Sequence, residues 1–93
     1  MKKYNSFEEA NRDLELLEIK HFGIIDAYIT GMLKIDEVKE FEAFLTEMRE
    51  AIYDMEVEEE HIMDIAKIKS KMQHYYTEIL EDEELLSVAY RNQ

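Results

Sequence analysis

The stretch Asp36–Glu58, DEVKEFEAFLTEMREAIYDMEVE, decides the fold of this chain. Its apolar residues follow one another at alternating steps of three and four, which places them along one face of an α-helix. These residues are Val38, Phe41, Leu45, Met48, Ile52 and Met55. We therefore expect an amphipathic helix that starts at Asp36, an acceptable N-cap residue, and runs to about Asp54.

Acidic residues occupy the opposite face of the same expected helix. Residues 36–60 carry eleven acids and two bases, so this block holds −9 of the chain's net charge of −12. So acidic a chain should be repelled by nucleic acids and anionic membranes, and attracted to basic protein surfaces. The predicted partner-binding residues are Asp36, Glu37, Glu40, Glu47, Glu50, Asp54 and Glu58.

Composition favours an all-α fold for the whole chain. The 93 residues suit one domain, residues 1–93, and they include no proline and only two glycines. Strands would need turn residues between them, and Met32–Gln93 offers no strong backbone breaker. We expect an antiparallel three-helix bundle. A short fourth helix at the C-terminal end could use Leu85, Leu86, Ala89 and Tyr90.

The helix before the central stretch is expected to begin at a capping box. The Ser6 hydroxyl can accept from the amide of Glu9, while the Glu9 carboxylate reaches back to the amide of Ser6. The helix should end at Thr30-Gly31, because glycine readily takes the left-handed conformation that closes a helix. Its core-facing residues are expected to be Phe7, Ala10, Leu14, Leu17, His21, Ile24 and Tyr28. Residues 1–5 are expected to form a frayed tail.

The helix after the central stretch is expected to follow a tight reversal near residues 55–58. One continuous helix from Asp36 to Leu80 would be about 68 Å long, and a monomer could not cover its apolar face. The reversal places Glu58–Glu60 in the first turn, where negative charge suits the helix dipole. The expected core-facing residues are Ile62, Ile65, Ala66, Ile68, Met72, Tyr75, Tyr76 and Ile79.

Two Glu-x-x-His patterns are the candidates for metal ligation, Glu18 with His21 and Glu58 with His61. Di-iron four-helix bundles use two such pairs together with glutamates from two other helices. Acids are 23 of the 93 residues, so this spacing also arises by chance. The first and third helices would run parallel, and no long fourth helix supplies the remaining ligand. We therefore predict no metal and no other cofactor, and keep these four residues as candidates for a ferritin-like alternative.

Association through apolar surface is a further expectation. Phe44 lies beside the apolar face of the central helix and would broaden it beyond what three short helices can cover, which favours a homodimer or a partner groove. Lys67, Lys69 and Lys71 are expected to pair with the acidic face of a neighbouring helix or of a second copy.

Several classes of function are disfavoured by what the sequence lacks. Without cysteine there is no disulfide framework, no thiolate metal site and no cysteine nucleophile. There is no serine–histidine nucleophile motif, no glycine-rich phosphate loop, and no apolar run long enough to span a bilayer. We expect a cytoplasmic protein that is not an enzyme and that does not bind nucleic acid directly.

Two resemblances add to this interpretation. Residues 4–17, YNSFEEANRDLELL, resemble the opening of small helical proteins of Bacteroidota, which implies a capped helix and no particular activity. As a type, the whole chain is similar to the small, acidic, cysteine-free inhibitors that phages carry against restriction or CRISPR nucleases. This second resemblance is one of class, so no residue roles follow from it.

The first functional hypothesis is a non-enzymatic inhibitor that docks its acidic helix on a basic protein, such as a nucleic-acid-guided or nucleic-acid-cutting enzyme. The alternative is a structural or regulatory helical module that dimerises, or acts as an adaptor, through its apolar seam. That alternative predicts sensitivity to a charge at Phe44 or Tyr76. The third hypothesis is the ferritin-like metal protein.

Overall fold

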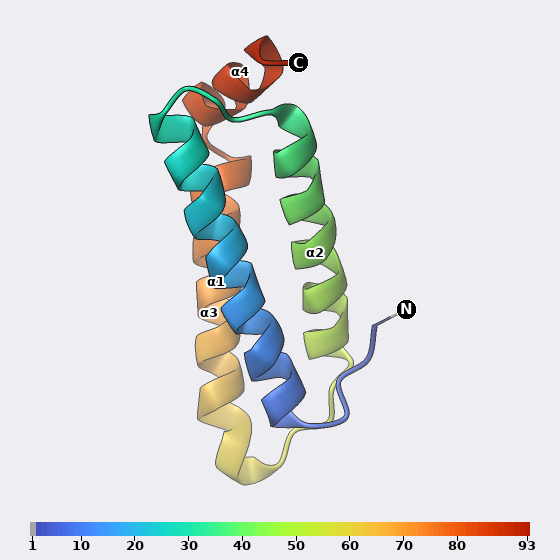
Figure 1. Ribbon diagram of the computed structural model, residues 1–93. Helices are drawn as coiled ribbons and strands as arrows, with labels where there is room; N and C mark the ends of the chain where they lie inside the picture. Colours follow the sequence, from blue (N-terminus) through green and yellow to red (C-terminus); the bar gives the residue numbers. More distant parts are fainter. Residues whose placement is uncertain (1) are drawn as a thin grey trace.

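The computed structural model, which describes residues 2–93, is an all-α bundle (Figure 1). Its elements are α1 (Phe7–Ile29), α2 (Ile35–Tyr53), the single 3₁₀ turn η1 (Glu59–His61), α3 (Ile62–Leu80) and α4 (Glu83–Arg91). The three long helices lie side by side and alternate in direction, and α4 lies across one end of the bundle. The predicted all-α fold, with a short fourth helix, is confirmed.

One apolar core runs between the three long helices, and every buried residue in the described part of the chain is apolar. All but one of the six predicted α2 seam residues are buried; Met55, which follows the helix, is half-buried. On α3 the predicted seam is wrong at Ile62 and Ala66, which are exposed. Ala66 follows the buried Ile65, and one residue along a helix turns about 100° away from its neighbour's direction.

The ends of α1 follow from local sequence. Glu9 donates its amide to the Ser6 hydroxyl at 3.4 Å, and its carboxylate accepts from the Asn5 amide at 2.7 Å, one residue before the predicted donor. Gly31 has a φ of 75°, and its amide donates to the carbonyl of Tyr28. The predicted helix stop at this glycine is therefore confirmed.

The predicted N-cap of α2 is wrong. The helix begins at Ile35, and its N-cap residue is Lys34, whose side chain makes no capping hydrogen bond. Asp36 lies in the first turn instead, where its charge still suits the helix dipole. Ile35 is buried, so the helix starts early enough to place this side chain in the core.

The reversal between α2 and α3 lies where it was predicted. Helix α2 ends at Tyr53, Met55–Glu58 is not helical, and η1 follows at Glu59. The predicted first turn of the third helix is instead this separate 3₁₀ turn, and α3 proper begins at Ile62.

Helix α4 fastens the opposite end of the bundle. Asp82 caps it by accepting from the Leu85 amide at 3.1 Å. Beyond its C-terminal end, the Asn92 amide nitrogen donates to the carbonyls of Gly31 and Leu33 at 2.8 and 2.9 Å. These bonds tie the end of the chain to the α1–α2 connection. Along residues 2–93, no helix has the length and apolarity that crossing a membrane requires.

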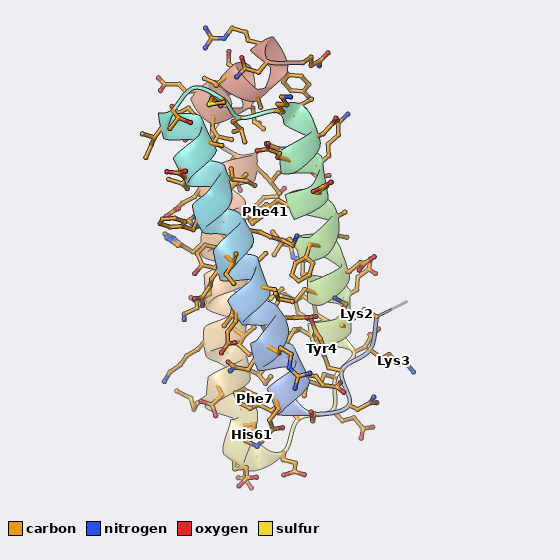
Figure 2. All side chains as sticks on the ribbon, viewed as in Figure 1. Lys2, Lys3, Tyr4, Phe7, Phe41 and His61 are labelled. Carbon is orange, nitrogen blue, oxygen red and sulfur yellow. The ribbon has the colours of Figure 1, made fainter. Side chains whose placement is uncertain are left out.

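The expectation of a frayed tail over residues 1–5 is wrong for residues 2–5, and residue 1 lies outside the described part of the chain. The Tyr4 hydroxyl donates to the Asp13 carboxylate at 2.7 Å, and the Lys2 ammonium lies 2.9 Å from the same oxygen. Figure 2 places Lys2 and Tyr4 beside the C-terminal end of α2, near the start of α1. One carboxylate on α1 thus fixes the segment through an ion pair and a hydrogen bond.

Replacing Tyr4 by phenylalanine should make the protein less sensitive to alkaline pH. Burial, and then the neighbouring Asp13 carboxylate, raise the pKa of Tyr4 above its usual value of 10.0. Above pH 10 the unfolded chain loses this proton while the folded chain keeps it, so folding stability falls as the pH rises. Tyr4→Phe should cost about 1 kcal/mol at pH 8, from the lost hydrogen bond. At pH 11 the free energies of unfolding of the variant and of the wild type should lie closer together than at pH 8, as measured by urea denaturation. A difference of equal size at both pH values would contradict the prediction.

Candidate protein-interaction surface

The acidic ridge consists of the seven predicted partner-binding residues, Asp36, Glu37, Glu40, Glu47, Glu50, Asp54 and Glu58. All seven are exposed, and the first six follow α2 from its first turn to its C-cap residue. Glu58 lies beyond the end of α2, in the connection to η1, so it is not on the same helical face as predicted. From Asp36 to Asp54 the ridge spans about 27 Å at 1.5 Å per residue.

No ion pair within the described chain neutralises the acidic ridge. In residues 2–93, the carboxylates that lie within 4 Å of a basic nitrogen belong to Asp13, Glu18, Glu60, Asp64 and Glu78. None of these is a ridge residue. Two carboxylates one helical turn apart, about 6 Å, repel each other by roughly 0.7 kcal/mol in water. A cationic surface would relieve that repulsion as well as add attraction.

The lysines of α3 make no ion pair with the acidic ridge within residues 2–93, so pairing with a neighbouring helix is wrong for α2, while pairing with a second copy stays a prediction. The Lys71 ammonium lies 3.3 Å from the Glu18 carboxylate on α1. The Lys69 ammonium lies over the Tyr53 ring, 4.8 Å from its centroid. Because α3 directs these cations to α1 and to an aromatic ring, the carboxylates of α2 stay available to another molecule.

The rings of Phe44 and Tyr76 are partly covered by other residues of the same chain. Both are half-buried. The ammonium groups of Lys2 and Lys20 lie 4.7 and 5.4 Å from the Phe44 ring centroid. The guanidinium of Arg49 lies 5.2 Å from the Tyr76 ring centroid. Cations of the same chain thus cover both rings, an interaction worth roughly 0.5–1 kcal/mol at exposed sites.

A row of exposed apolar side chains lies on α1. We call Ile19, Phe22 and Ile29 the α1 outer stripe; their exposed fractions are 68%, 73% and 75%. Steps of three and seven residues place them on one helical face, away from the core residues of α1. The spacing of these three residues is visible in the sequence. The prediction missed it because the core-facing residues of α1 form a longer and more regular pattern. Helix α1 is therefore apolar on two sides.

The four metal candidates are not brought together. His61 stacks on Phe7 at the start of α1, with ring centroids 4.7 Å apart. His21 is 14 residues further along α1, about 21 Å at 1.5 Å per residue. The two Glu-x-x-His pairs therefore cannot form one di-metal centre of the ferritin-like kind. Glu18 is held by Lys71 rather than directed at a shared site.

His21 is a packing residue in the α1–α3 interface. Its Nε2 lies 2.6 Å from the Glu78 carboxylate, and its ring lies 4.4 Å from that of Tyr75. Burial, and then the charge of Glu18, raise the pKa of Tyr75, which keeps its hydroxyl protonated beside these acids. This cluster links two helices of the bundle.

A different set of possible ligands gathers at the bottom of the bundle in Figure 2, around His61. Glu58, Glu60 and His61 each offer a ligand atom, and these atoms lie within 4.8 Å of one another. Carboxylate and imidazole groups are ligands for Zn²⁺ and similar cations. Both glutamates are exposed, and His61 is held by its stacking on Phe7, which ties η1 to the start of α1.

Comparisons with protein-family models, with curated proteins and with solved structures found no match to this chain. Two features distinguish the surface of the protein, the acidic ridge on α2 and the α1 outer stripe.

Proposed function

We propose that this chain is a non-enzymatic inhibitor that docks its acidic ridge on a basic, nucleic-acid-binding surface of a partner enzyme. The type of partner is a nucleic-acid-guided or nucleic-acid-cutting enzyme, as for anti-CRISPR and anti-restriction proteins. The observation that carries the proposal is the row of exposed carboxylates on α2 that no base of the described chain neutralises.

The spacing of the carboxylates supports imitation of a polyanion. One DNA strand offers a phosphate roughly every 3.4 Å, or about eight over 27 Å. Six ridge carboxylates span the same length of α2. The ridge is sparser than DNA, but the helix is already ordered, so little conformational entropy is lost on binding. Docking would release anions held by the basic surface.

The test is capture of the partner with the tagged full-length chain from its native host, followed by mass spectrometry and an activity assay. The proposal expects a nucleic-acid-binding enzyme that elutes with added salt and whose activity the purified chain inhibits. DNA or RNA substrate should compete with the chain for that enzyme, because both would occupy one basic surface. Capture of an enzyme whose activity and nucleic-acid binding are unchanged by the chain would refute the proposal.

The α1 outer stripe favours a second candidate function, a helical module that associates with a second copy of itself. Three exposed apolar side chains on one helical face form the kind of patch that marks protein contacts. Two copies that each carry −12 repel each other. Added salt would screen that repulsion and strengthen the dimer, whereas it would weaken docking on a basic partner. The sign of the salt dependence separates the two candidates.

Phe22→Glu should abolish association through this stripe and leave the fold intact. Phe22 is 73% exposed, so a charge there costs little in the monomer but would be desolvated in an interface. Sedimentation at high salt should show a dimer for wild type and a monomer for the variant. Thr77→Glu, which adds the same charge at an exposed position on α3, is the control and should remain dimeric. A wild-type chain that is monomeric at every salt concentration would eliminate this second candidate.

A further inference from the structure

Gly23 is a glycine for which the fold itself gives no reason. It lies within α1, where glycine costs about 1 kcal/mol relative to alanine. It does not have a positive φ, which among the glycines only Gly31 has. A Cβ atom built on it would meet nothing within 4 Å. Neither backbone conformation nor packing within the described chain therefore requires glycine at this position.

The missing side chain opens a groove between α1 and α2. The groove has a volume of about 210 Å³ and is lined by Lys20, Gly23, Ile24, Glu37, Glu40 and Phe41. Ile24 and Phe41 lie at its base, but they are only 4% and 1% exposed and offer almost no surface to another molecule. Figure 2 shows Phe41 between the two helices. The volume is below the 300 Å³ or so at which small-molecule pockets begin, so the groove suits a single side chain.

The charges at the groove identify the side chain that fits it. Glu37 and Glu40 are exposed ridge residues, three positions apart on α2, and neither has an ion-pair partner within residues 2–93. The one base of the lining, Lys20, has its ammonium near the Phe44 ring instead. A small groove beside the bare backbone of Gly23 and two unneutralised carboxylates matches a long side chain with an aliphatic stem and a cationic end.

We propose that this groove receives an arginine side chain from the basic partner, with its stem over Gly23 and its guanidinium at Glu37 and Glu40. Arginine fits better than lysine, because a guanidinium is more weakly hydrated and can bind two carboxylates through its fork of donors. The inference rests on the proposed function and adds one specific anchor to the acidic ridge.

The probe is hexa-arginine, acetylated and amidated, titrated into the isotopically labelled full-length chain at low salt, with hexa-lysine as its charge-matched counterpart. Backbone amide shifts should change most at Gly23, Ile24 and Phe41, and hexa-arginine should bind more tightly than hexa-lysine. Equal affinities of the two peptides would overturn the assignment to arginine. Shifts spread evenly over the acidic residues, with no maximum at the groove, would overturn the groove as the site.

A variant that fills the groove without changing any charge tests the geometry. Gly23→Leu should weaken hexa-arginine binding about tenfold, the loss of two exposed charge contacts. Leucine is a strong helix former, so the thermal midpoint should stay the same or rise, which excludes unfolding as the cause. Ala43→Leu adds the same side chain at an exposed α2 position outside the groove and should leave the affinity within about twofold.

A third variant separates this inference from the proposed function. Glu47→Gln, Glu50→Gln and Asp54→Asn together reduce the ridge but leave the groove residues unchanged. Loss of binding to the captured enzyme in this triple variant, but not in Gly23→Leu, would overturn the groove and keep the proposed function. Loss of binding in both the triple variant and Gly23→Leu would support the groove as well as the proposed function. Full binding by both variants would overturn the groove and the proposed function. Loss of binding in Gly23→Leu alone would keep the groove and overturn the extended ridge as a docking surface.

Discussion

Replacing Phe41 by alanine should lower the free energy of unfolding by about 3–5 kcal/mol, the usual cost of truncating a buried phenylalanine. Phe41 is 1% exposed and packs in the core cluster from the middle of α2. A domain of this length has a stability of about 5–14 kcal/mol, so the substitution would remove a large part of it. The thermal midpoint should fall by roughly 12–40 °C. Urea and thermal denaturation followed by circular dichroism would measure the change.

Phe22→Ala is the matched control, because it truncates the same side chain on the surface of α1. Phe22 is 73% exposed, so the free energy of unfolding should change by no more than about 0.5 kcal/mol. Similar losses in the two variants would mean that the packing of α2 described above is wrong. A folded Phe41→Ala protein with wild-type stability would do the same.

The parts of the fold that sequence could predict are those set by short-range signals. The three-four spacing on α2 depends only on helical geometry, and Ser6 and Gly31 mark the ends of α1 through their own hydrogen bonds and φ. The reversal after Tyr53 followed from a length argument, since an unbroken helix could not be covered. Each of these needs no knowledge of what lies across the bundle.

The parts that sequence reasoning missed depend on contacts between distant residues. Phe44 is covered because Lys2 and Lys20 reach it from outside α2, 42 and 24 residues earlier in the chain. The N-terminal segment is held by Asp13, which nothing in residues 1–5 indicates. The start of α2 was misplaced for a related reason, since the burial of Ile35 outweighs capping by Asp36.

The candidate site was predictable in composition but not in environment. That Glu40 and its neighbours lie opposite the α2 seam follows from helical periodicity. Whether a base from elsewhere in the chain lies close to them does not follow, because any of the nine lysines and arginines outside α2 could have folded against it. Helix α3 directs Lys71 to Glu18 on α1 instead. The groove at Gly23 was equally hidden, since it depends on the packing of α1 against α2.

Neutralising four ridge residues together should weaken binding to the captured enzyme by about 1–4 kcal/mol, roughly 5- to 1,000-fold, if each exposed contact contributes 0.2–1 kcal/mol. The variant replaces Glu40, Glu47 and Glu50 by Gln and Asp54 by Asn. Its affinity, measured by calorimetry, should also depend less steeply on salt than that of wild type.

The fold of this variant should be kept, which makes a loss of binding interpretable. Glu50 lies three residues after Glu47 and four before Asp54, so the charges repel along the helix, and neutralising them should stabilise α2 slightly. The control neutralises four exposed acids outside the ridge, Glu8, Glu15, Glu59 and Glu81, and so changes the net charge equally. If net charge alone draws the partner, the two variants will weaken binding alike. If the acidic ridge is the docking surface, only the ridge variant will lose affinity, because the control leaves the row of carboxylates on α2 unchanged.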